Sequence, residues 1–151
     1  MKLLKLVYSE ACIKETLRLR PPVREWFRQH WTGQNMKIKD KEYYMLPGAS
    51  IFTVADLIQT DELHWPDSDV FDPERFLSDQ KRHPYCFIPF SAGARNCLGQ
   101  KFAMIQLKIV LSLLLTSFDL EATENVSKLT VASDFVAAPH PAMQIKINEV
   151  Y

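Results

Sequence analysis

The sequence predicts an α+β fold that is mainly α-helical and carries small antiparallel β-sheets. Three observations lead to this prediction. Apolar residues recur at helical spacing near the amino terminus, short extended segments bounded by turn residues follow, and the most apolar stretch lies in the last third of the chain. Because the 151 residues contain no internal repeat, low-complexity tract or linker, we expect a single domain over residues 1–151.

The first predicted helix runs from about residue 2 to residue 20, where Pro21 and Pro22 stop the helical pattern. Asp40 and the turn dipeptide Pro47-Gly48 then divide the chain into short extended pieces. These pieces lie at about residues 36–38, 43–46 and 50–54. The pattern therefore predicts a small antiparallel sheet directly after the first helix.

The second half of the chain begins with a short predicted helix at residues 55–58. A connection rich in proline and aspartate follows at residues 64–73, which cannot form a long regular element. Residues 98–118 predict a long helix, and its most apolar part falls short of the roughly 20 residues that a membrane span needs, so we expect a buried core helix. Residues 120–147 predict a carboxyl-terminal β-hairpin with a turn at Pro139-His140-Pro141.

Charge and cysteine content exclude several classes of protein. The formal net charge is zero, so nothing indicates a nucleic acid or an acidic membrane as partner. Three cysteines without paired spacing argue against a disulfide framework and fit a reducing compartment. We expect Cys12 and Cys86, like Trp65, to be packing residues, and no motif suggests zinc. Lys5 interrupts the amino-terminal apolar run, so no signal peptide or membrane anchor is predicted.

The third cysteine, Cys97, stands in a loop at the entry to the long helix. Gly93 allows a tight turn under a flat cofactor, and Gly99 allows the helix to approach it closely. The free amides of the helix start favour the thiolate, which is the form that ligates a metal. This arrangement suits a haem iron held through sulfur. The alternative is a buried cysteine at a loop-to-helix junction with an accidental pattern.

Phe90, Gly93, Arg95, Cys97 and Gly99 fill every fixed place of the pattern F-x-x-G-x-R-x-C-x-G. The stretch therefore resembles the haem-binding loop of the cytochromes P450. The resemblance implies haem b (iron protoporphyrin IX) as cofactor and Cys97 as its metal ligand. It also implies that Phe90 lies against the sulfur side of the macrocycle, although plain core packing would account for Phe90 as well.

Two arginines are implied to hold the haem propionates. Arg95 precedes the cysteine by two residues, and Arg28 matches the arginine on the strand that follows the family's E-x-x-R helix, which corresponds to the first helix predicted here. A guanidinium suits a carboxylate because it offers a planar fork of donors. The alternative for both is a solvated surface arginine.

A second group of residues supports the same resemblance. Glu15 and Arg18 lie three residues apart on one helix face, as many weakly paired surface charges do. Followed by Pro21 and Pro22, they resemble the E-x-x-R helix of the cytochromes P450, and Pro73-Glu74-Arg75-Phe76 matches the P-E-R-F segment of that family. The resemblance implies that Glu15, Arg18 and Arg75 form a buried, architectural network, and it assigns no catalytic residue.

The resemblance also implies an activity. Such an enzyme is a monooxygenase that inserts one oxygen atom from O2 into a C–H bond of a lipophilic substrate, with NADPH used indirectly through NADPH-cytochrome P450 reductase. The run from His83 to Met104 looks most like the microsomal branch that hydroxylates fatty acids at or near the chain end. That branch implies the endoplasmic reticulum membrane as location.

The resemblance covers the carboxyl-terminal, haem-proximal part of the family's fold. We therefore expect a fragment whose partner is the missing amino-terminal half, with impaired or absent turnover by itself. Gly48 and Ala49 depart from the family, which usually has a basic residue and then glycine there. The alternative function is a non-catalytic haem-binding or interaction remnant of a cytochrome P450.

Overall fold

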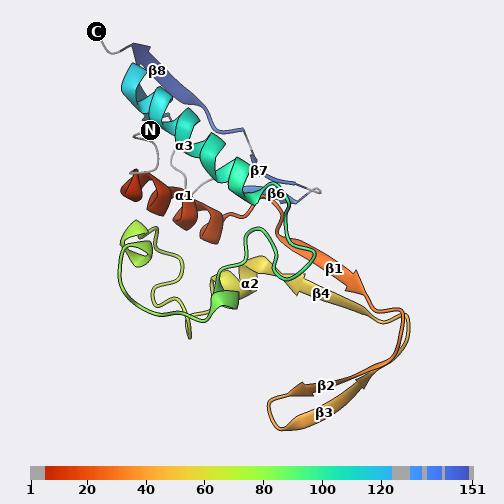
Figure 1. Ribbon diagram of the computed structural model, residues 1–151. Helices are drawn as coiled ribbons and strands as arrows, with labels where there is room; N and C mark the ends of the chain where they lie inside the picture. The colour runs from red at the N-terminus through yellow and green to blue at the C-terminus, as the bar shows by residue number, and fades with distance from the viewer. Residues whose placement is uncertain (1–5, 124–129, 134–135, 141, 150–151) are drawn as a thin grey trace. The chain divides into compact units, whose positions relative to one another are not determined.

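Residues 6–123, 130–133, 136–140 and 142–149 are described by the computed structural model of the chain (Figure 1). They fall into two units. Unit 1 comprises the chain up to Arg24 and from Ala55 onward, and unit 2 comprises Glu25–Val54. Unit 1 contains the helices together with small antiparallel strand pairs, and unit 2 contains antiparallel strand pairs alone.

The first helix, α1, spans Val7–Leu19 and is buried on two sides within unit 1. Its buried side chains combine apolar residues with one ion pair, and they are Ala11, Ile13, Glu15, Leu17 and Arg18. The Arg20 N–H donates to the Thr16 carbonyl at 2.8 Å and ends the helix just before the buried Pro21. The helix is therefore the predicted one, and residues 2–5 of the prediction lie outside the described residues.

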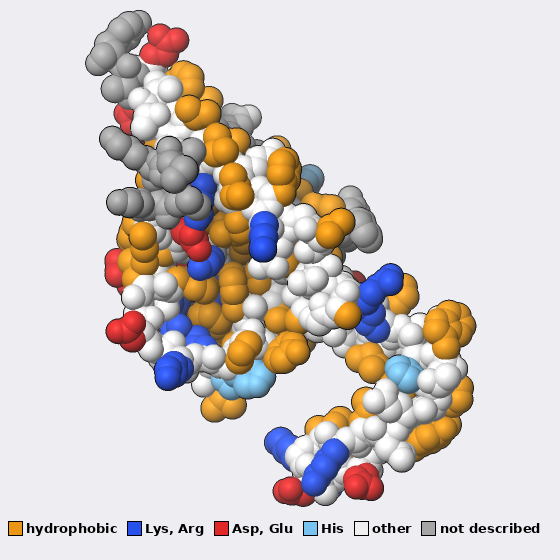
Figure 2. Space-filling view, viewed as in Figure 1, with side chains coloured by type: hydrophobic (Ala, Val, Ile, Leu, Met, Phe, Trp, Pro, Cys, Tyr) orange, Lys and Arg blue, Asp and Glu red, His pale blue; other side chains and the backbone are white. Residues whose placement is uncertain are grey.

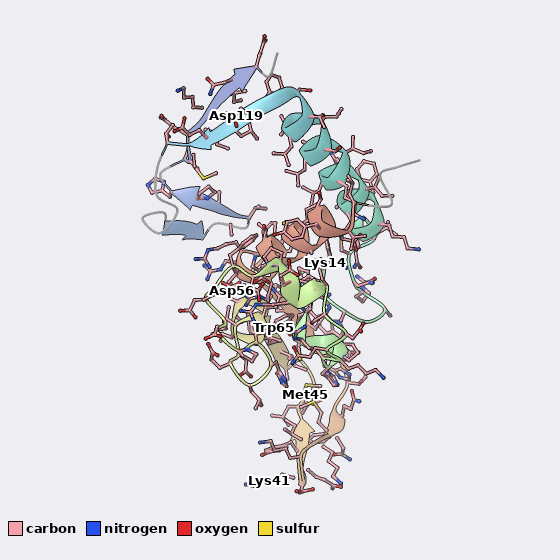
Figure 3. All side chains as sticks on the ribbon, turned by 90° about the vertical axis from the view of Figure 1, so that its left-hand side faces the viewer. Lys14, Lys41, Met45, Asp56, Trp65 and Asp119 are labelled. Carbon is pink, nitrogen blue, oxygen red and sulfur yellow. The ribbon has the colours of Figure 1, made fainter. Side chains whose placement is uncertain are left out.

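Unit 2 consists of two antiparallel strand pairs. Strand β1 (Glu25–Gln29) pairs with β4 (Ser50–Val54), and β2 (Gln34–Ile38) pairs with β3 (Lys41–Met45). In Figure 3, Lys41 and Met45 mark the two ends of β3. Lys39 has a φ of 54° in the turn between β2 and β3, and Gly48 has a φ of 80° before β4. The extended segments predicted from the sequence correspond to β2, β3 and β4.

Unit 1 resumes with the short helix α2 (Ala55–Gln59). The connection that follows contains only two 3₁₀ turns, η2 (Pro73–Phe76) and η3 (Pro84–Cys86), as its proline and aspartate content predicts. Asp72 begins η2, because its Oδ1 accepts the Glu74 N–H at 3.0 Å. This irregular segment packs η2 against α1 and places Arg75 beside Glu15.

The long helix α3 spans Gln100–Ser117 and contacts α1. Lys108 of α3 pairs with Glu10 of α1. None of the α3 residues is buried within the described chain, whereas the sequence predicts a core helix. By length and composition α3 also qualifies as a helix that could cross a membrane, a test that core helices of soluble proteins pass as well.

The end of the chain forms two further strand pairs in unit 1. Strand β5 (Phe118–Ala122) pairs with β8 (Ile145–Glu149), and β6 (Thr130–Ser133) pairs with β7 (Ala137–His140). The predicted turn at Pro139-His140 is wrong, because both residues lie in β7. A strand of a two-stranded sheet has a free edge, and proline is tolerated there since it needs no ladder donor. Pro141, the last residue of that prediction, lies outside the described residues.

Candidate functional site

A buried ion pair lies at the centre of unit 1. Arg18 donates from Nε to Glu15 Oε2 and from Nη2 to Glu15 Oε1, both at 2.8 Å, and both side chains are fully buried. The Nε of Arg75 lies 3.4 Å from Glu15 Oε1, and the Asp72 N–H donates to the same oxygen at 3.0 Å. The structure therefore brings together Glu15, Arg18 and Arg75, the three residues for which the sequence predicts a network.

Both arginines also hold the irregular segment through its carbonyl groups. Arg18 donates from Nη1 to the Gln59 carbonyl at 2.9 Å, and Arg75 donates to the carbonyls of Pro66 and Asp67 at 2.5 and 2.8 Å. A guanidinium can satisfy several acceptors at once because its five N–H groups form a fixed planar fork. One buried carboxylate thus organises two arginines and, through them, residues 59–72.

Gln59 is a buried polar residue that the sequence analysis missed. Its Nε2 donates to the carbonyls of Leu17 and Arg18 at 3.1 and 3.0 Å, and its Oε1 accepts the Ile88 N–H at 2.8 Å. The side chain is completely buried. No local pattern marks such a residue, because glutamine is ordinarily exposed and its partners here lie far away in the sequence.

Trp65 lies within cation–π distance of two guanidinium groups. Those of Arg18 and Arg82 lie 5.2 and 4.7 Å from the ring centroid, and the indole Nε1 donates to the Cys86 carbonyl at 3.2 Å. Trp65 is 1% exposed and lies below α1 in Figure 3. Burial, followed by the neighbouring charge of Arg75, lowers the pKa of Arg82 from its ordinary value. The predicted packing role of Trp65 therefore comes with polar contacts.

A cavity of about 270 Å³ opens beside this cluster, lined in part by Trp65, Arg75, Arg82 and Phe87. Neither Cys97 nor Arg95 lines it. The predicted haem ligand therefore belongs to a different surface of unit 1.

The cysteine loop, residues 90–99, is held by backbone hydrogen bonds. The Ser91 N–H donates to the Ile88 carbonyl at 3.0 Å, and the Cys97 N–H donates to the Phe90 carbonyl at 2.9 Å. Gly93 has a φ of 82°, a left-handed conformation that residues with a side chain disfavour. The Asn96 N–H donates to the Gly93 carbonyl. The Cys97–Phe90 hydrogen bond thus ties Cys97 to the start of the loop.

Cys97 is exposed and lies just before the start of α3. Gly99 is the N-cap of α3 and supplies no capping side chain, so the first amides of the helix remain available to a negative group. A Cβ at Gly99 would lie 3.9 Å from the Cys97 Sγ, which is an ordinary contact. An accessible sulfur beside a helix amino terminus has the donor chemistry of a thiolate ligand, so the residues fit a haem iron.

The remaining predicted residues have different settings. Arg95 is exposed in the cysteine loop, and Phe90 is half-buried at its start. Arg28 lies in β1 of unit 2, where its Nη1 donates to the Phe27 carbonyl at 3.0 Å. The structure thus places Phe90, Gly93, Arg95, Cys97 and Gly99 in one loop, while Arg28 belongs to the other unit.

Comparison with known proteins identifies the family. Residues 2–147 match the family described as Cytochrome P450. The chain belongs to the cytochrome P450 family. Haem binding and monooxygenase chemistry are properties of that family as a whole.

Curated cytochromes P450 cover nearly the whole of this chain. Cytochrome P450 4V2 of Homo sapiens is 36% identical over 146 residues, which is 95% of this chain and 27% of that protein. Cytochrome P450 4B1 of Rattus norvegicus is 40% identical over 120 residues, which is 78% of this chain and 23% of that protein. The chain thus spans about a quarter of the length of the curated cytochromes P450 it matches.

Solved structures show the same relation. A cyanobacterial CYP120A1 bound to retinoic acid superposes with a TM-score of 0.85 and 27% sequence identity, covering 98% of this chain and 34% of that one. CYP102L1 gives a TM-score of 0.84 at 28% identity, covering 99% of this chain and 33% of that one. The described chain is therefore part of the cytochrome P450 fold.

Proposed function

We propose that this chain is the haem-proximal, carboxyl-terminal part of a cytochrome P450 monooxygenase. The enzyme inserts one oxygen atom from O2 into a C–H bond of a lipophilic, fatty-acid-like substrate. One observation carries the proposal: Cys97 is exposed in a loop closed by the Cys97–Phe90 hydrogen bond of 2.9 Å, directly before the uncapped start of α3.

Cys97 is the proposed iron ligand. It lies directly before the uncapped amino terminus of α3, and Gly93 and Gly99 leave room for a flat ring above the loop. When bound, the haem supplies oxygen activation at an iron whose thiolate ligand favours O–O cleavage. Phe90 limits the access of water to the sulfur, which tunes the iron electronically.

Arg95 and Arg28 are the proposed partners of the haem propionates. Each carries a guanidinium, which binds a carboxylate through two parallel N–H donors. Arg95 extends from the cysteine loop itself and is exposed, as a side chain that binds a cofactor from the protein surface must be.

Glu15, Arg18 and Arg75 have an architectural role in this proposal. Their buried contacts fix residues 59–72 and, through Gln59 and Trp65, the segment that leads into the cysteine loop. No catalytic residue is assigned to this chain. The amino-terminal half of the fold would supply the substrate chamber and the proton delivery. NADPH-cytochrome P450 reductase at the endoplasmic reticulum membrane would supply the electrons.

Reconstitution with haem tests the ligand. The purified chain is loaded with haem, reduced and exposed to carbon monoxide, and the expected result is the red-shifted Soret band of thiolate-ligated iron. Cys97→Ser abolishes the band, whereas Cys12→Ser, which alters a half-buried cysteine on α1, retains it. A band that persists in Cys97→Ser, or its absence from the unaltered chain, contradicts the assignment.

Turnover is tested separately. Incubation of the haem-loaded chain with reductase, NADPH and a fatty acid should give little or no hydroxylated product, because this part of the fold lacks a wall that excludes water from the reacting face. Product at the level of a complete cytochrome P450 would refute the incompleteness of the chain.

One observation favours a second candidate, a non-catalytic remnant that binds haem or a protein partner. No residue of α3 is buried, and large apolar side chains follow this helix on the face shown in Figure 2. The exposed large apolar side chains in and just before α3 include Leu98, Phe102, Ile105, Val110, Leu113 and Leu115. Such a surface favours association. Concentration-dependent self-association with a thiolate Soret band but no product in the presence of the missing half would support this candidate.

A further inference from the structure

We propose that Gln59 is a positioning residue that fixes the cysteine loop relative to α1. This inference rests on the proposed role of Cys97 as haem ligand. It assigns to one amide side chain the task of transmitting the position of the Glu15–Arg18 helix to the segment that carries the sulfur.

The amide of Gln59 joins two segments that are remote in the sequence. Both Nε2 donors bind carbonyls at the end of α1, those of Leu17 and Arg18, at 3.1 and 3.0 Å. The Oε1 atom accepts the Ile88 N–H at 2.8 Å. The Gln59 backbone carbonyl in turn accepts the Arg18 Nη1 at 2.9 Å, so the residue is bound to α1 by three contacts.

From Ile88 two backbone bonds lead to the sulfur-bearing residue. The Ile88 carbonyl accepts the Ser91 N–H at 3.0 Å, and the Phe90 carbonyl accepts the Cys97 N–H at 2.9 Å. Ile88 is 6% exposed, so its N–H has no access to solvent as a substitute partner. The position of Cys97 therefore depends on the side chain of Gln59 through the hydrogen bonds of Phe90 and Ile88.

Trp65 provides the neighbouring anchor, and the two differ in what they hold. Its indole N–H binds the Cys86 carbonyl at 3.2 Å, two residues farther from the loop than Ile88. Trp65 also packs against Phe76 and Phe87, so its removal disrupts a hydrophobic cluster. The contacts described above for the Gln59 side chain are all hydrogen bonds. A substitution of similar size therefore removes these hydrogen bonds with little change in packing.

The experiment compares Gln59→Leu with Leu17→Ala in the full chain. Leu retains most of the volume of Gln but removes all three side-chain hydrogen bonds. Leu17 lies on the same helix, is 7% exposed and forms no side-chain bond to the loop, so Leu17→Ala controls for general loss of stability. Gln59→Glu retains the acceptor for the Ile88 N–H but removes the amide donors to α1, and it serves if Gln59→Leu does not fold.

The first readout is amide hydrogen exchange at Cys97, which Gln59 does not touch. We expect exchange at Cys97 in Gln59→Leu to be faster than in the unaltered chain by at least about tenfold, after correction for global unfolding, and a smaller increase in Gln59→Glu. Leu17→Ala should show no increase beyond its global unfolding. Equal corrected exchange at Cys97 in Gln59→Leu and Leu17→Ala overturns the proposal.

The second readout is the thiolate Soret band after haem loading and addition of carbon monoxide. At equal folded fraction, the share of thiolate-ligated haem should fall severalfold in Gln59→Leu and remain near that of the unaltered chain in Leu17→Ala. An unchanged share in Gln59→Leu refutes a positioning role toward the cofactor. If the unaltered chain shows no thiolate band, Cys97 fails as a ligand, and the hydrogen exchange alone then decides whether Gln59 holds the loop.

Discussion

Two regions of unit 1 carry the strongest sequence motifs, and they differ in how completely the chain satisfies them. Around Glu15, both the carboxylate and the Arg18 guanidinium are fully buried and bonded at 2.8 Å. Around Cys97, the thiol is exposed and the following α3 buries none of its residues. The Glu15 cluster finds its partners within this chain, whereas the cysteine loop leaves its thiol exposed and α3 leaves its apolar side chains incompletely buried.

The difference follows from what each region has to protect. A buried charge without partners costs several kcal/mol, so Glu15 requires Arg18 and Arg75 in place before the segment can pack. A thiol and scattered apolar side chains remain exposed at much lower cost. A motif of buried charged residues thus requires its partners to pack around it within the same chain. A metal-ligand motif requires a loop shape that leaves the ligand atom accessible.

Glu15→Ala should break the comparison most strongly. It leaves Arg18 and Arg75 buried without their carboxylate, and we expect a loss of about 3–5 kcal/mol in the free energy of unfolding. Denaturant unfolding followed by circular dichroism measures it. The matched control is Glu121→Ala, because Glu121 is exposed and lies 3.8 Å from Lys146; its effect should stay below about 1 kcal/mol. Similar losses in the two variants would contradict the central role of the Glu15 cluster.

A smaller effect is expected where the two regions meet, at Glu10 of α1. Hydrogen bonds from Lys108 of α3, and then from Lys14, lower the pKa of Glu10 from its ordinary value of 4.5. The lowered pKa means that Glu10 stabilises the folded chain above the pKa of the unfolded state, and this contribution disappears as the pH falls through the folded value. Because Glu10 is partly exposed, the contribution should stay below about 1 kcal/mol.

Comparison of Glu10→Gln with the unaltered chain measures this contribution. The difference in free energy of unfolding should be constant near neutral pH and shrink toward zero in acid below 4.5. Lys108→Met should reduce the same acid dependence, because it removes the first of the two donors. A difference that grows as the pH falls would contradict the assigned sign.

Cys97→Ser should have the smallest effect on stability. Because Cys97 is exposed, we expect the free energy of unfolding to change by less than about 0.5 kcal/mol, even though the proposed ligand is lost. Cys86→Ser is the matched control: Cys86 is 3% exposed, and a hydroxyl there should cost about 1–3 kcal/mol. A loss at Cys97 as large as that at Cys86 would favour a buried packing cysteine over a ligand.

Local sequence rules predict much of this fold. Pro21 and Pro22 limit α1, the turn residues separate β2, β3 and β4, and the long apolar run becomes α3. These features depend on backbone dihedrals and on periodicity, which neighbouring residues determine. The carboxyl-terminal segment is the exception. Pro139 lies in β7 because an edge strand can lack one backbone N–H donor, and the turn propensity of proline does not depend on whether a strand lies at an edge.

The candidate site divides along a different line. The spacing of Glu15 and Arg18 places them on one helix face, but only the family resemblance adds Arg75, which lies far along the chain. Gln59 was missed altogether, because its role depends on carbonyls at the end of α1 and on the N–H of Ile88 meeting at one point. Such coincidences of distant backbone groups are tertiary facts with no local signature.

The chain passes from unit 1 into unit 2 and back again at two neighbouring backbone positions. Glu25 is the register partner of Val54, and immediately outside this pair the Ala55 N–H donates to the Arg24 carbonyl at 2.7 Å. The two points at which residues 26–53 join the rest of the chain therefore lie side by side. Replacing residues 30–49 by a tight reverse turn would keep the Glu25–Val54 pair, the Arg24–Ala55 hydrogen bond and Arg28 of β1, so the length of this stretch can change without altering the path of the helices in unit 1.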